Sequence, residues 1–146
     1  MTETATACAL CTLAASGGPD QGWVARNDLV SAYANGSNIP GWIQLQVNRH
    51  AANLGELSAE ESAAVGALSS AIGKAALDIT GASKLYAFSM CEFVPHFHLV
   101  LGPAPEVPPG VDRGSPLLSR IMVRDDALQD AARAVEVAAQ IRTVLA

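Results

Sequence analysis

The chain has 146 residues, of which 50% are hydrophobic and 16% are charged, and its formal net charge is −5. This length predicts a single domain, residues 1–146, with a hydrophobic core of its own. The 9 Lys and Arg residues are scattered and form no basic stripe for nucleic-acid phosphates. No apolar run approaches the roughly 20 residues that cross a bilayer, and no Lys or Arg precedes Arg26 to start a secretory signal. We therefore expect a cytoplasmic protein without nucleic-acid or membrane partners, and a small molecule as its ligand.

The first pattern along the chain is a C-x-x-C pair, Cys8 and Cys11, followed by a loop-like segment at 12–19. We interpret residues 1–20 as a knuckle and loop. In a reducing compartment this spacing favours a metal site over a disulfide. A thioredoxin-like redox pair is the alternative reading, but such a pair follows a strand and opens a helix, and the composition of 12–19 predicts neither.

Three short strands are predicted next, at 23–25, 29–33 and 42–47. In the third, Ile43, Leu45 and Val47 alternate with two glutamines, which is typical of a half-buried strand. This strand leads directly to His50.

The second half of the chain predicts two main helices. Ser58 and Glu61 match a capping box, and apolar residues at three- and four-residue spacing continue to Gly81. A strand is expected at 84–91, a proline-rich loop at 102–116 with a short helical piece from Ser115, and a C-terminal helix at 125–145. The fold class is therefore α+β, with a mainly antiparallel sheet.

Two of the three histidines lie in the segment 94–100. In an extended strand His96 and His98 share one face, about 7 Å apart, while Phe97 and Leu99 point the other way. Together with Cys8 and Cys11, the histidines suggest a metal site with one imidazole left for chemistry.

The ordered motifs resemble the histidine triad family. They are the C-x-x-C pair, the run from Gly41-Trp42 to Arg49-His50, the segment from Leu54 to Glu61, and Val94-Pro95-His96-x-His98. The resemblance implies a histidine-triad-like fold and a middle histidine that attacks the α-phosphorus of a nucleotide. Val94-Pro95 and Pro103 make His96 the first histidine, His98 the nucleophile and Val100 the third position. A register slipped by one step, with His96 in the middle, is the alternative.

The resemblance also implies zinc. In zinc-containing members, and in the related galactose-1-phosphate uridylyltransferases, the corresponding residues bind the ion; here they are Cys8, Cys11, His50 and His96. Four protein ligands leave no open position, so the zinc would be structural. The alternative is that the two histidines are hydrogen-bonded and the cysteines merely buried. Family members commonly pair through the helix and an adjoining strand, so a homodimer is expected.

Several positions depart from the family pattern. Glu92 and Phe93 replace polar uncharged residues, Val100 replaces the third histidine, and Ala104 replaces an arginine. Each change removes a donor for phosphate oxygens, and Arg113, Arg120 or Arg124 would have to supply the charge. Two hypotheses remain open: a nucleotide hydrolase or nucleotidyltransferase with Val100, Phe93 and Arg113 beside the substrate, or a protein that binds or transforms a non-nucleotide metabolite with Glu92 and His98 as an acid/base pair. Cys91 is expected to be a buried apolar residue.

Overall fold

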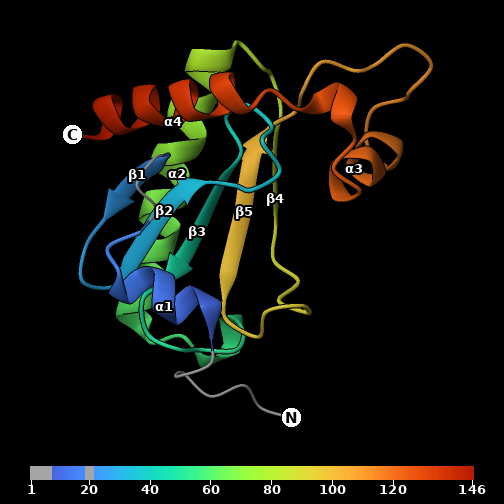
Figure 1. Cartoon of the computed structure of the whole chain (residues 1–146). Coiled ribbons are helices and arrows are strands. Elements are labelled where there is room, and N and C mark those ends of the chain that lie inside the picture. Colours follow the sequence, from blue (N-terminus) through green and yellow to red (C-terminus); the bar gives the residue numbers. More distant parts are fainter. Residues whose placement is uncertain (1–7, 19–21) are drawn as a thin grey trace.

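A computed structural model describes residues 8–18 and 22–146. Its centre is a five-stranded antiparallel sheet in the order β1-β2-β3-β5-β4 (Figure 1). The strands are β1 (Trp23–Arg26), β2 (Val30–Ala34), β3 (Ile43–Val47), β4 (Leu85–Phe88) and β5 (His98–Pro103). The predicted α+β class and antiparallel sheet are confirmed.

One face of the sheet is covered by two long helices, α2 (Ala59–Thr80) and α4 (Ala131–Leu145), as Figure 1 shows. The predicted capping box is present: the Ser58 hydroxyl accepts from the Glu61 amide, and the Glu61 carboxylate accepts from the Ser58 amide. Gly81 ends α2 in the left-handed conformation, at φ 72°. The main core lies between these helices and the apolar side of the strands, where Ile43, Leu45 and Ile72 are fully buried.

The opposite face of the sheet carries the site. A short helix α1 (Ala9–Ala15) crosses one end of the strands, and α3 (Ser115–Met122) packs near the other end (Figure 1). A second core cluster joins Trp42 and Val100 of the sheet to Leu117 and Ile121 of α3. Two 3-10 turns complete the structure, η1 (Leu54–Glu56) and η2 (Asp126–Leu128). In the part of the chain that the structure describes, no helix is both long and apolar enough to cross a membrane.

Several boundaries differ from the sequence-based expectations; among them, the strand predicted at 84–91 is shorter and ends at Phe88 as β4. The predicted knuckle and loop at 1–20 contains the helix α1, while its residues 1–7 and 19–20 lie outside the described part. The strand predicted at 94–100 begins only at His98, because the preceding segment turns, with the His96 amide donating to the Val94 carbonyl. The loop predicted at 102–116 gives its first residues to β5 and its last to α3. The C-terminal helix begins at Ala131 after η2, where the Asp130 carboxylate caps it by accepting from the Arg133 amide.

Candidate metal centre and active site

Four side chains from distant parts of the chain converge at one end of the sheet. Cys8 immediately precedes α1, Cys11 lies in its first turn, His50 follows β3, and His96 precedes β5. One potential ligand atom from each of the four lies within 4.8 Å of all the others. Cys8 and His96 are completely buried, so the cluster is closed to solvent on that side.

The spacing of these atoms fits a tetrahedral ion. The Cys8 Sγ lies 3.3 Å from the His96 Nδ1, and the Cys11 Sγ lies 3.4 Å from both the His50 Nδ1 and the His96 Nδ1. Bond lengths of about 2.3 Å to sulfur and 2.0–2.1 Å to nitrogen place such atoms roughly 3.5 Å apart around zinc. A Cys2His2 set is typical of structural zinc, and the predicted structural zinc site is confirmed at the residues that would hold the ion.

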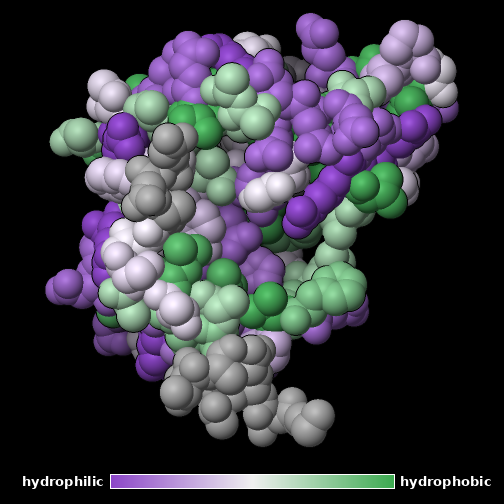
Figure 2. All heavy atoms as spheres, in the orientation of Figure 1, coloured by the Kyte–Doolittle hydropathy of each residue, from purple (hydrophilic) through white to green (hydrophobic). Residues whose placement is uncertain are grey.

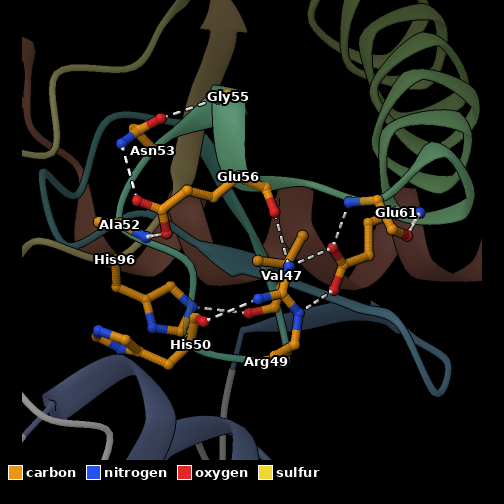
Figure 3. A network of polar contacts seen from close by, with 10 residues as sticks. Val47, Arg49, His50, Ala52, Asn53, Gly55, Glu56, Glu61 and His96 are labelled. Atoms are coloured by element: carbon orange, nitrogen blue, oxygen red, sulfur yellow. Dashed lines mark hydrogen bonds and ion pairs between the residues drawn. The ribbon is translucent and has the colours of Figure 1, made fainter.

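The ring of His96 is oriented by a second contact. Its Nε2–H donates to the Val47 carbonyl at 2.8 Å (Figure 3). Nδ1 is therefore unprotonated, and it lies 3.3 and 3.4 Å from the two cysteine Sγ atoms. Backbone carbonyls commonly hold metal-bound imidazoles in this way and set which nitrogen binds the metal. The end of β3 therefore positions a ligand that lies almost fifty residues further along the chain.

Arg49 holds the loop that carries His50 (Figure 3). Its guanidinium donates to both carboxylate oxygens of Glu61, at 3.0 and 2.8 Å, and to the carbonyls of His50 and Glu56. The hydrogen bonds from Arg49, and then from the Ser58 amide, hold the pKa of Glu61 below its usual value. The N-terminus of α2 is thus tied to the backbone that presents His50.

The remaining histidine, His98, starts β5 and is not part of the metal cluster. Its Nδ1–H donates to the His96 carbonyl at 2.8 Å. Among the described residues no hydrogen-bond partner contacts its Nε2, so this nitrogen is available to a ligand. The two histidines do not share one strand face as predicted, because His96 precedes β5 and its ring is buried.

His98 lines a pocket of about 390 Å³ on the sheet face between α1 and α3. The apolar walls include Leu10, Trp42, Phe88, Val100 and Met122. Three neutral polar side chains also line it: Asn35 and Ser37 from the loop between β2 and β3, and Gln44 from β3. Apolar side chains also gather over this side of the surface, beside α1 and the loop before β5 (Figure 2).

The structure brings most of the sequence-predicted site residues to this pocket. Glu92 and Phe93 line it beside His98, with Phe93 93% exposed, and Val100 forms part of its buried wall. Arg113 is not among the lining residues and Arg120 is paired with Asp125 at 2.5 Å, whereas Arg124 lines the pocket at the end of α3.

Cys91 was expected to be buried and apolar, and this expectation is wrong. The residue is half-buried in the pocket wall, and its Sγ lies 4.0 Å from the His98 Nδ1. Asn35 and Gln44 were not predicted as site residues. The polar side of the predicted strand 42–47 was the available signal for Gln44.

Comparison with known proteins places this geometry in a structural class. No protein-family model matches the chain, and no curated protein matches it. Solved structures do match. A zinc-bound histidine triad family protein from Mycobacterium smegmatis is 17% identical over 97% of this chain and 95% of that one, with a TM-score of 0.68. A HIT-like protein from Bartonella henselae involved in cell-cycle regulation is 19% identical over 91% and 92% of the two chains, with a TM-score of 0.66.

A third match is the diadenosine triphosphate hydrolase of Plasmodium falciparum. It is 12% identical, with a TM-score of 0.60, and the alignment covers 87% of this chain and 78% of that one. At these identities the likeness establishes the fold, and the chain has the histidine triad fold predicted from its motifs.

Proposed function

We propose that this histidine triad fold serves as a nucleotide hydrolase or nucleotidyltransferase in which His98 is the nucleophile. The observation that carries the proposal is the contact between the His98 Nδ1–H and the His96 carbonyl, at 2.8 Å. It keeps the proton on Nδ1 and the lone pair on Nε2, which is the form of imidazole that can attack phosphorus. The diadenosine triphosphate hydrolase with the same fold is consistent with this chemistry.

In the first step the Nε2 lone pair forms a bond to the α-phosphorus of the nucleotide. The bond between phosphorus and the leaving group breaks, and the leaving group departs with that electron pair and takes up a proton. In the second step a water oxygen attacks the phosphorus, the P–N bond breaks, and its electron pair returns to Nε2, while the proton that the water loses restores the acid that protonated the leaving group. Zinc, when bound to Cys8, Cys11, His50 and His96, would hold α1 against the strand ends and take no part in these steps.

Two charged residues at the pocket are suited to this reaction. Arg124 is the one Arg or Lys among the described lining residues. Of the three candidates from the sequence, Arg113, Arg120 and Arg124, we therefore assign the phosphate contact to Arg124. Glu92 is exposed at the pocket, and we assign it the role of the acid that protonates the leaving group. Both residues lie in segments that flank β5 or follow α3.

The proposal is tested by trapping the covalent intermediate. The protein is mixed with adenosine 5′-phosphoramidate or a diadenosine polyphosphate, stopped in alkali and weighed by mass spectrometry. An adenylyl adduct that is lost in acid, as a P–N bond is, and that is absent in His98→Ala supports the proposal. Cys91→Ser is the matched control, since the Cys91 thiol lines the same pocket and its Sγ lies 4.0 Å from the His98 Nδ1. A folded, zinc-loaded protein that forms neither adduct nor product contradicts the proposal.

A second function is favoured by one specific observation, the apolar character of the pocket. Val100 stands at the third motif position and contributes an apolar wall with Trp42, Phe88 and Met122, and the pocket also contains the carboxylate of Glu92. A site of this kind suits an uncharged or cationic metabolite better than a polyphosphate. In that case Glu92 and His98 would act as an acid/base pair, and the adduct experiment would give no adduct.

We also propose a two-fold homodimer formed through α2 and β4. Two features support it. β4 is an edge strand of the sheet, and Leu85 on it is 37% exposed. The exposed side of α2 carries small residues, among them Ala63, Gly66 and Ala67, which allow a second helix to approach closely. An uncovered strand edge is a ready surface for pairing with another copy.

A further inference from the structure

A chain of side-chain hydrogen bonds runs across the sheet beneath the His98 pocket. Asn35 Nδ2 donates to Gln44 Oε1 at 3.3 Å, and Gln44 Nε2 donates to the Tyr33 hydroxyl at 2.9 Å. The Tyr33 hydroxyl donates to Gln46 Oε1, and Gln46 Nε2 donates to the Leu10 carbonyl at 2.9 Å. We call these four side chains, Asn35, Gln44, Tyr33 and Gln46, the amide relay.

The strand register explains why these residues meet. Tyr33 is opposite Gln44 across β2 and β3, and Gln46 is opposite His98 across β3 and β5. Residues paired in this way point to the same face of a sheet. Gln46 is nevertheless completely buried, because α1 covers that end of the face. A buried amide needs partners for its polar atoms, and the relay provides them.

Both ends of the relay are backbone groups of fixed polarity. At one end the Leu10 carbonyl can only accept, so Gln46 must direct its NH2 there and its oxygen toward Tyr33. Tyr33 must then donate to Gln46 and accept from Gln44. At the other end the Ser37 amide can only donate, and it donates to Asn35 Oδ1 at 3.0 Å. Each amide therefore has one permitted orientation.

This orientation decides what the pocket offers a ligand. The oxygens of Asn35 and Gln44 already accept hydrogen bonds, while each NH2 group has a second hydrogen with no recorded partner among the described residues. We propose that Tyr33 and Gln46 are positioning residues that fix Gln44 and Asn35 as hydrogen-bond donors to an acceptor group of the ligand, such as a phosphoryl oxygen. This deepens the proposed function, on which it rests, because these donors would substitute for those missing at Val100 and Ala104.

Two further features support the relay. Burial raises the pKa of Tyr33 well above its ordinary value, more than the hydrogen bond from Gln44 lowers it, so the hydroxyl keeps its proton. The anchor at Leu10 lies between Cys8 and Cys11, so the helix held by the metal cluster also holds the end of the relay. Leu10 itself lines the pocket.

The test uses Tyr33→Phe, which removes only the hydroxyl and frees Gln44 to rotate. NMR follows the side-chain amide signals of Asn35, Gln44 and Gln46 while the zinc-loaded protein is titrated with dimethyl phosphate, a probe that has acceptors but no donors. In the wild type we expect slow exchange of the Gln46 amide hydrogens and a shift of the Gln44 and Asn35 signals on titration. In Tyr33→Phe the response of Gln44 should weaken by about two- to tenfold, as expected for one hydrogen bond.

Tyr86→Phe is the matched control, because Tyr86 packs on Trp42 at a ring distance of 6.5 Å and has no part in the relay. It should leave all three amide signals as in the wild type. Equal responses in the wild type and Tyr33→Phe, or none in either, would overturn the inference. Failure of the nucleotide adduct experiment alone would contradict the proposed function and leave this result in place, because the NMR readout needs no turnover.

Discussion

At the scale of single residues, Arg124 combines two unusual properties. It lines the His98 pocket with no recorded ion pair among the described residues, and its φ of 54° is one that side chains other than glycine seldom adopt. Backbone strain and a pocket cation at the same position allow charge and stability to be tested separately.

We predict that Arg124→Gly slows adduct formation by about tenfold or more, since a hydrogen bond to a charged group contributes about 1.5–3 kcal/mol. The free energy of unfolding should change by less than about 1 kcal/mol, because glycine adopts positive φ without strain. Rapid-quench kinetics and urea unfolding measure the two quantities.

Arg124→Lys should retain part of the rate, since it keeps the charge but loses the forked geometry. Arg113→Ala is the control and should react as the wild type does, because Arg113 does not line the pocket. A normal rate in Arg124→Gly would remove Arg124 from the mechanism.

At the scale of elements, α1 is a helix of seven residues whose position depends on its ligands. Helices this short are not stable by themselves in water. We predict that Cys8→Ser lowers the zinc content far below one ion per chain and reduces the free energy of unfolding by more than about 4 kcal/mol, because metal binding contributes directly to folding. Elemental analysis measures the zinc content, and thermal unfolding measures the loss of stability. The control Cys91→Ser should retain the zinc.

The N-terminus of α2 gives a pH-dependent prediction. The pKa of Glu61 is lowered in the folded protein, first by the hydrogen bonds from Arg49. A lowered carboxyl pKa stabilises the fold above the unfolded value of about 4.3, and that contribution is lost as the pH falls through the folded pKa. Glu61→Gln should therefore be less stable than the wild type at pH 7, by about 1 kcal/mol, and should approach it near pH 3.

Urea unfolding across this pH range measures the difference. Glu136→Gln is the control, since its pairing with Arg133 at 2.8 Å is solvent-exposed on α4 and should contribute little at either pH. A constant gap between Glu61→Gln and the wild type at all pH values would contradict the assignment.

At the scale of the whole molecule, the sheet separates two tasks. The face under α2 and α4 holds the main core, and the face under α1 and α3 holds the metal cluster and the pocket.

We predict that the wild type sediments as a dimer at micromolar concentration. Leu85→Lys, which places a charge on the edge strand, should sediment as a monomer and still bind zinc. A monomeric wild type would contradict the proposed dimer.

How much of this could be predicted from the sequence depends on how local the cause is. Alternation placed Gln44 and Gln46 on the correct side of β3, and the capping box located the start of α2, because both depend on neighbouring residues. The four metal ligands were identified through their motifs. The helical form of α1 was missed although Ala and Leu make up most of it, because the segment was interpreted together with the Gly-rich residues that follow it.

The rest depends on contacts between distant segments. His96 leaves the strand because its ring is turned inward to the cysteines and Val47, a constraint that strand periodicity does not contain. Arg124 joins Asn35 and Gln44 in one pocket only once α3 has packed on the same face of the sheet. The choice among three arginines therefore needed the fold.

His96 serves both halves of the site at once. Its ring contacts the cysteines and Val47, and its backbone carbonyl accepts a hydrogen bond from the Nδ1–H of His98. If both roles hold, a cell short of zinc would contain chains whose attacking nitrogen is poorly aligned, so metal supply would limit the active fraction and not merely the amount of folded protein.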